Sequence, residues 1–171
     1  MTCIVGINNG ARVYIGSDRS ASDDITIMSM CRPKVHTRNG FIFAYAGSIG
    51  VGQLMEMIDL NSTHDDPYYT IRLSVVEQMR KAIESFSSTS DDESANFLIG
   101  YKKRLFELST GDWSVVEVEE SAVGSGGPIA LGSLYTTRNL YTDPAIRIRL
   151  AIESAIHYSP TCAGPVDILH V

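Results

Sequence analysis

Two pairs of short hydrophobic runs open the chain, and each run has the length of a β-strand. Residues 2–7 and 11–17 are separated by the segment 8–10, which consists of Asn, Asn and Gly. Residues 33–38 and 41–46 are separated by an Asn-Gly pair. Because Asn and Gly tolerate the positive φ angles of tight turns, the pattern predicts two consecutive β-hairpins.

The hydrophobic positions that follow recur every three or four residues, which is the spacing of helices. A short helix is predicted after Gly47. Two longer helices are predicted to start at residues 66–67 and 143–144, where an Asp that can cap the helix precedes a Pro suited to the first turn. The glycine-rich segment 124–128 opens a further helix that runs to Leu134.

The remaining hydrophobic runs have the composition of strands. Residues 95–101, 105–109 and 113–118 predict a three-stranded meander, and residues 165–171 predict a closing strand. The order of elements favours the α+β class, with two stacked antiparallel sheets and helices outside them. No repeat or linker interrupts this order, so we expect a single domain over residues 1–171.

The composition and charge exclude several classes of protein. Hydrophobic residues make up 44% of the chain and charged residues 20%, as in a folded protein. The formal net charge is −6, which argues against a nucleic-acid partner because phosphate contacts need clustered Lys and Arg. No uncharged run is long enough for a transmembrane helix, so no membrane partner is expected. The first residues lack the basic segment of a signal peptide, which predicts a cytoplasmic protein.

The residues that commonly bind metals are scattered. Cys3, Cys31 and Cys162 do not have the spacing of a zinc site or of a disulfide framework. The four histidines never fall four residues apart from one another, so no zinc-peptidase helix is present. We therefore expect neither a metal nor an organic cofactor.

Counting along the first hairpin places two polar residues at its open end. We expect the turn to centre on Asn9. Thr2 then lies opposite residue 16 or 17, and Asp18 follows just beyond. Side chains that are diagonal neighbours on one face of a sheet can reach one another, so Thr2 and Asp18 are predicted to lie close together.

The second hairpin has its own polar end. An Asn-Gly turn pairs Lys34 with Tyr45, and Gly47 lies just past this pair. If both hairpins belong to one sheet, Thr2, Asp18 and Lys34 gather at one edge of it.

These three residue types together have a known chemistry. A threonine hydroxyl becomes a nucleophile when a base removes its proton. If Met1 is removed, Thr2 carries such a base, because its own α-amine has an ordinary pKa of about 8. A Lys34 ammonium would lower the pKa of the amine and of the hydroxyl, and Asp18 would hold that ammonium in position. Gly47 could donate a backbone N–H to the oxyanion that forms.

An ordered set of short motifs extends this picture to the whole chain. The motifs are Thr-Cys-Ile-Val-Gly-Ile after Met1, Ile-Gly-Ser-Asp-Arg at 15–19, Lys34, Phe-Ala-Tyr-Ala-Gly-Ser at 43–48, Gly-Ser-Gly at 124–126 and Ala-Leu-Gly at 130–132. Together they resemble the proteasome β-type branch of the N-terminal nucleophile (Ntn) hydrolases. The length is most similar to that of the bacterial HslV-type peptidase or of a bacterial or phage proteasome-like protein.

The resemblance implies a fold, an activity and an assembly. The fold is a four-layer αββα sandwich of two antiparallel sheets. The activity is that of a threonine-type peptidase that cleaves polypeptide substrates inside a self-compartmentalising ring of identical subunits, with an ATP-dependent unfoldase as partner. In this resemblance Thr2 is the nucleophile and base, Asp18 and Lys34 support it, Gly47 is the oxyanion donor, and Ser125 bonds near the amine.

The resemblance also assigns a pocket and contains one departure. The residues that it places near the pocket for the substrate side chain are Ala21, Arg32, Tyr45 and Ile49. Many proteasome β-subunits carry an Asp and then a Ser-Gly-Gly after the last long helix, and Pro160 and Ala163 stand at those places in this chain. Two alternatives stay open: a catalytically silent subunit kept for assembly, and a dimeric hydrolase of small amides.

Overall fold

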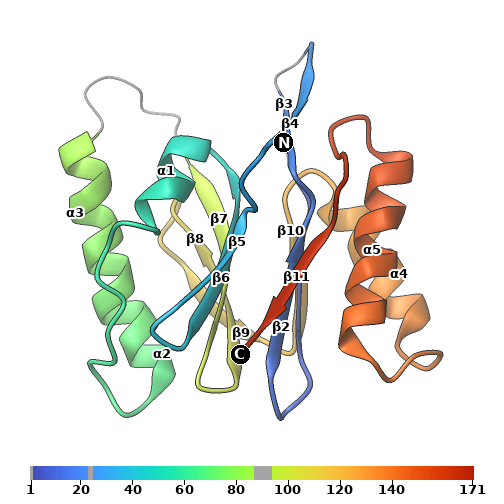
Figure 1. Cartoon of the computed structure of the whole chain (residues 1–171). Helices are drawn as coiled ribbons and strands as arrows, with labels where there is room; N and C mark the ends of the chain where they lie inside the picture. The colour runs from blue at the N-terminus through green and yellow to red at the C-terminus, as the bar shows by residue number, and fades with distance from the viewer. Residues whose placement is uncertain (1, 23–24, 87–93) are drawn as a thin grey trace.

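The computed structural model describes residues 2–22, 25–86 and 94–171 of the chain. Two antiparallel sheets stack face to face, and helices cover the outer face of each (Figure 1). This arrangement confirms the α+β class and the four-layer αββα sandwich that the sequence predicts. Within the described ranges, no helix has both the length and the hydrophobicity needed to cross a membrane.

The first sheet carries both ends of the described chain. Helices α4 (Gly127–Thr137) and α5 (Pro144–Tyr158) pack against its outer face. Its strands are, in spatial order, β10 (Glu120–Val123), β1 (Ile4–Asn8), β2 (Val13–Ser17) and β11 (Asp167–His170).

The second sheet is formed by the middle of the chain. On its outer face lie α1 (Ile49–Leu54) and a longer helical run made of α2 (Pro67–Tyr69), the π-helical segment η1 (Thr70–Val75) and α3 (Val76–Phe86). Its strands are, in spatial order, β5 (Val35–Arg38), β6 (Phe41–Gly47), β7 (Ala95–Tyr101), β8 (Arg104–Ser109) and β9 (Val115–Val118).

Each sheet is buried on both faces, which explains why its strands are almost continuously hydrophobic. Along β1, Ile4 points into the layer between the sheets, whereas Val5 points toward α4 and α5. Along β6, Ala44 points between the sheets, whereas Phe43 and Tyr45 point toward α1 and α3. The alternation therefore separates three hydrophobic layers, one between the sheets and one under each helix pair.

Several local predictions are confirmed. The β5–β6 hairpin pairs Val35 with Ala44, which continues to the expected alignment of Lys34 with Tyr45. Asp66 accepts a hydrogen bond from the N–H of Tyr68, and Asp143 caps α5 in the same way. The Asp-Pro pairs thus start helices as predicted.

The register of the first hairpin is not as predicted. Ile4 pairs with Ser17, so Thr2 lies level with Arg19 instead of with residue 16 or 17. The cause is the Asn9 side chain, whose Oδ1 accepts hydrogen bonds from the N–H groups of Ala11 and Arg12 at 3.1 and 2.9 Å. These bonds stabilise a loop over 9–12 that is longer than the expected turn.

Within residues 2–22, 25–86 and 94–171, three strands were not predicted. Strand β10 is four residues long and contains Glu and Ser, so its sequence carries little strand signal. Strands β3 (Ser20–Ser22) and β4 (Ile27–Ser29) form a separate small sheet that projects above the two large ones (Figure 1). The two N-terminal hairpins also lie in different sheets, not in one.

Candidate active site

Thr2, Asp18 and Lys34 meet where the ends of the two sheets come together. Thr2 precedes β1 and Asp18 follows β2 in the first sheet, whereas Lys34 precedes β5 in the second sheet. Their exposed fractions are 5%, 0% and 2%. The predicted juxtaposition is therefore present, but it arises across the interface between the sheets instead of along one sheet edge.

The Lys34 ammonium joins the three side chains. Its Nζ donates hydrogen bonds to Thr2 Oγ1 and to the backbone oxygen of Ser20, and lies 3.3 Å from Asp18 Oδ1. Burial lowers the pKa of Lys34, and the negative charge of Asp18 opposes that fall. The Thr2 hydroxyl thus lies against a cation that is held inside the protein.

The Asp18 carboxylate is buried, and its oxygens accept bonds from several elements. Oδ1 accepts a bond from the N–H of Cys3 at 3.1 Å. Oδ2 accepts bonds from the N–H of Ala163 at 3.3 Å, from the N–H of Ser20 at 3.4 Å and from the Ser20 hydroxyl. These donors and Lys34 compensate for the loss of water around the carboxylate. Asp18 thereby connects β1, the β2–β3 segment and the loop after α5.

The backbone of Thr2 is enclosed by the Gly-Ser-Gly loop between β10 and α4. The Thr2 nitrogen donates to Ser125 Oγ at 3.3 Å, and the Gly126 nitrogen donates to the Thr2 oxygen at 3.2 Å. Gly124 has a φ of +93°, and a Cβ there would lie 2.2 Å from the Thr2 oxygen. Glycine is therefore required at this position for both conformation and space.

A chain of hydroxyl groups continues from Ser125. Its Oγ lies 2.8 Å from Thr161 Oγ1, which lies 2.9 Å from Ser159 Oγ. Sequence reasoning missed Ser20, Ser159 and Thr161 as parts of the site. For the last two, a signal was available: both flank Pro160, in the segment where the family pattern is broken.

Gly47 ends β6 beside the start of α1. It is exposed and has a φ of +109°, and a Cβ there would lie 2.5 Å from the backbone oxygen of Ser94. A residue with a side chain would clash with the backbone of Ser94 and Ala95, and the positive φ also favours glycine. Its role as an oxyanion donor stays a prediction.

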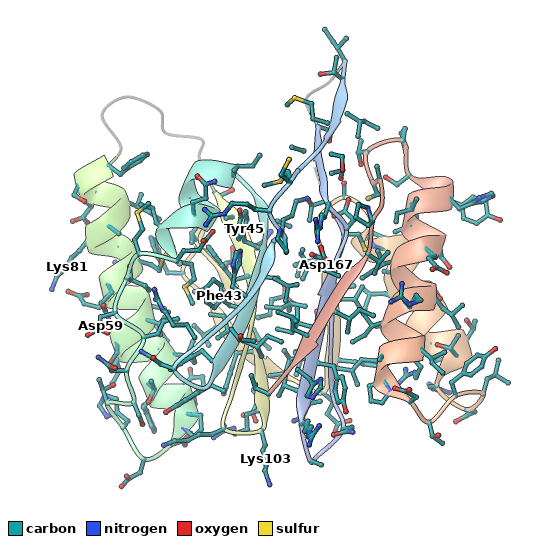
Figure 2. The ribbon with its side chains drawn as sticks, in the orientation of Figure 1. Phe43, Tyr45, Asp59, Lys81, Lys103 and Asp167 are labelled. Atoms are coloured by element: carbon teal, nitrogen blue, oxygen red, sulfur yellow. The ribbon has the colours of Figure 1, made fainter. Side chains whose placement is uncertain are left out.

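The four residues assigned to the substrate pocket differ in their surroundings. Figure 2 shows Tyr45 below α1, where its ring packs against Gly52 and burial raises its pKa to about 12. Arg32 is exposed, but its charge is near enough to oppose that rise. Ile49 opens α1 at 39% exposure, and Ala21 is buried in β3. The hydrogen bonds that join Thr2, Asp18, Lys34 and Ser125 include none of these four, and none to Gly47.

The polar groups around Thr2 are suited to proton transfer. Asp18 is surrounded by hydrogen-bond donors, and one of them is a cation. In the part of the chain that the structure describes, no cluster of three His, Cys, Asp or Glu side chains is placed to hold a metal ion. What the arrangement provides is a hydroxyl, a cation beside it, and a backbone nitrogen held by a serine.

Comparison of sequences finds no relative. No protein-family model matches the chain, and no curated protein sequence matches it significantly. Similarity is therefore found at the level of structure.

Solved structures match over nearly the whole chain. BPH from Thiobacillus denitrificans, in complex with epoxomicin, is 20% identical with a TM-score of 0.85, and the match covers 99% of this chain and 98% of that one. Eukaryotic HslV from Trypanosoma brucei is 15% identical with a TM-score of 0.72, covering 99% and 98%. The Gly-1 mutant of Anbu from Hyphomicrobium sp. strain MC1 is 17% identical with a TM-score of 0.73, covering 98% and 80%. These similarities show that the chain has the Ntn-hydrolase fold, as the sequence resemblance implies.

Proposed function

We propose that the chain is a cytoplasmic threonine-type peptidase whose nucleophile is Thr2, exposed by removal of Met1. The observation that carries the proposal is the contact of Lys34 Nζ with both Thr2 Oγ1 and Asp18. A buried cation beside an alcohol favours the ionised form of that alcohol. Eukaryotic HslV from Trypanosoma brucei shares the fold found in this chain, and the sequence motifs resemble those of the HslV-type peptidases.

In the proposed reaction the Thr2 amine takes the proton of Oγ1 while Oγ1 bonds to the carbon of the substrate carbonyl. The N–H of Gly47 is proposed to stabilise the oxyanion that results. The protonated Thr2 amine then gives its proton to the departing amine of the substrate. The C–N bond of the substrate breaks, and an ester to Thr2 remains. A water molecule deprotonated by the same amine hydrolyses this ester, which restores the hydroxyl of Thr2.

The assembly is part of the same proposal. We infer from the family resemblance that identical subunits form a ring with the sites inside, and that an ATP-dependent unfoldase supplies polypeptide substrates. BPH, which has the same fold, is solved in complex with epoxomicin. Epoxomicin is a peptide epoxyketone, and this class of compound adds to a terminal threonine without a leaving group. It is therefore a direct probe of the proposed nucleophile.

The test is intact-mass measurement of the purified protein before and after incubation with epoxomicin. We expect a chain that starts at Thr2 and gains the mass of one probe molecule, and we expect Thr2→Ala to gain nothing. A matched control is Thr136→Val, because among the described residues the Thr136 hydroxyl bonds only to carbonyls of its own helix, α4. Retention of Met1, or a processed wild type that stays unlabelled, would contradict the proposal and favour a silent assembly subunit. Sizing of the native particle separates a ring from a dimeric hydrolase of small amides.

A further inference from the structure

The hydroxyl chain beyond Ser125 has no part in the reaction described above. It runs from the Thr2 nitrogen to Ser125, Thr161 and Ser159, at successive distances of 3.3, 2.8 and 2.9 Å. We propose that Thr161 is a positioning residue, which keeps the Ser125 hydroxyl as an acceptor for the Thr2 amine. This inference rests on the proposed function, since it concerns the base of that reaction.

The direction of the Ser125 hydroxyl proton decides whether Ser125 supports or blocks the Thr2 amine as a base. The Ser125 hydroxyl has a single proton and can direct it at the Thr2 nitrogen, the Thr2 oxygen, Thr161 Oγ1 or the Cys162 sulfur, which is a weak acceptor. A proton directed at the amine would occupy the lone pair that the amine needs as a base. The Thr2 oxygen is 3.5 Å away, a long distance for a hydrogen bond, whereas Thr161 Oγ1 is at 2.8 Å. Thr161 is therefore the best acceptor, and the lone pairs of Ser125 remain available to the N–H groups of the amine.

Thr161 is itself fixed from two sides. Its backbone oxygen lies 3.0 Å from the Ser20 hydroxyl, whose single proton is shared between this oxygen and Asp18 Oδ2. Its backbone nitrogen donates to Ser159 Oγ at 3.4 Å, which leaves Ser159 as an acceptor on the side that faces Thr161. The Thr161 hydroxyl can thus donate to Ser159 while it accepts from Ser125. The result is a neutral chain of hydroxyls that ends at the Thr2 nitrogen.

The charged groups around the amine are not altered by a change at Thr161. Lys34 and Asp18 face Thr2 from the second and first sheets. Cys3 follows it in the chain, and Cys162 lies beside the hydroxyl chain. Burial raises the pKa of both thiols, so both stay neutral; at Cys162 hydrogen bonding to the Ser125, Ser159 and Thr161 hydroxyls partly opposes the rise. A change in the titration of the amine on replacing Thr161 would therefore report on Ser125.

The variants that test this are Thr161→Val, which keeps the shape but removes the hydroxyl, and Thr161→Ser, which keeps the hydroxyl. An ammonium that loses a well-directed acceptor is less stable, so its pKa falls. In Thr161→Val we expect the pKa of the Thr2 amine to fall by about 0.5–1 unit, the value of one neutral hydrogen bond. We expect the rate of epoxomicin labelling, measured at a pH where the amine is deprotonated in both proteins, to fall by about fivefold, because the Ser125 proton can then occupy the lone pair of the amine. Thr161→Ser should restore both.

Two measurements keep this separate from the proposed function. NMR titration of isotopically labelled threonine gives the pKa of the Thr2 amine without any turnover, and labelling rates across pH give its effect on reactivity. If the wild type is labelled but Thr161→Val has the same amine pKa and rate, the positioning role is wrong and the peptidase proposal stands. If the wild type is not labelled but the pKa of the Thr2 amine falls in Thr161→Val as expected, the positioning role stands and the peptidase proposal is wrong. If Thr161→Ser is as impaired as Thr161→Val, packing of the methyl group is responsible and the inference fails.

A further variant covers the case in which Thr161→Val does not fold. Ser159→Ala removes the second acceptor of the chain but leaves Thr161 in place. We expect a smaller fall of the amine pKa in the same direction, and Thr136→Val should leave the pKa unchanged. An unchanged amine pKa in a folded Ser159→Ala variant, together with an unchanged labelling rate, would count against a chain of dependent hydroxyls.

Discussion

Lys34 keeps an ammonium group at 2% exposure beside the Thr2 hydroxyl and the Asp18 carboxylate. Leaving water costs a cation several kcal/mol, and a single carboxylate offsets only part of this. The net effect is a lowered pKa for Lys34. At this scale the site balances the need for a cation near the nucleophile against the tendency of a buried lysine to lose its proton.

This balance predicts how labelling depends on alkaline pH. The rate should rise as the amine loses its proton, and fall again as Lys34 loses its own. Because the pKa of Lys34 is lowered from the ordinary value of 10.5, we expect the alkaline fall to begin below that pH. Lys34→Arg keeps a charge that does not titrate in this range. The labelling rate of this variant should therefore not decrease at alkaline pH, even if it is lower than that of the wild type overall. The measurement is the rate constant for epoxomicin labelling between pH 6 and about 11. An alkaline fall that is the same in both proteins would mean that another group titrates.

At the scale of elements, loops decide how well the sequence predicts the structure. The turn between β5 and β6 is an Asn-Gly pair with backbone geometry that depends on those two residues, and its register follows from the sequence. The loop between β1 and β2 depends on hydrogen bonds of the Asn9 side chain, which residue types alone do not reveal. The same limit applies to the site. Thr2, Asp18 and Lys34 follow from motifs, but Thr161 meets Ser125 only through folding of the last loop.

The loop between β10 and α4 provides a prediction at this scale. Gly124→Ala places a Cβ at 2.2 Å from the Thr2 oxygen, in a residue with a φ of +93°. We expect the loop to move away, which breaks the bonds of Ser125 and Gly126 to Thr2. The expected cost is about 1–3 kcal/mol of unfolding free energy, as for other overpacked sites. Epoxomicin labelling should be lost or nearly lost.

Gly10→Ala is the matched control for Gly124→Ala. Gly10 also has a positive φ, +83°, but nothing lies within 4 Å of the added Cβ. Its cost should be the conformational strain alone, about 1–2 kcal/mol, with labelling at the wild-type rate. Chemical denaturation gives both stabilities. Equal labelling of the two variants would show that the contact between Gly124 and Thr2 does not support the site.

At the scale of the molecule, the site depends on the fixed position of the two sheets relative to each other. Thr2 and Asp18 belong to one sheet, and Lys34 belongs to the other. What holds the sheets together is the hydrophobic layer between them, which includes Ile4 from the first and Leu98 from the second. A shift of this layer would change the distance between Lys34 and Thr2 without altering either hairpin. Packing between the sheets should therefore influence the reactivity of Thr2.

A pair of core variants tests this directly. Leu98→Ala opens a cavity between the sheets, whereas Leu108→Ala opens one between the second sheet and its helices. Both leucines are fully buried, so each change should cost about 2–5 kcal/mol of unfolding free energy. Because misplacement of reacting groups by about 1 Å can cost up to a hundredfold in rate, we expect Leu98→Ala to lower epoxomicin labelling by about tenfold at a temperature where both variants are folded. Leu108→Ala should label almost as fast as the wild type. If the two variants lose stability to the same degree and also react equally fast, the spacing of the sheets does not set the reactivity of Thr2, and the contacts of Lys34 alone must be sufficient to maintain it.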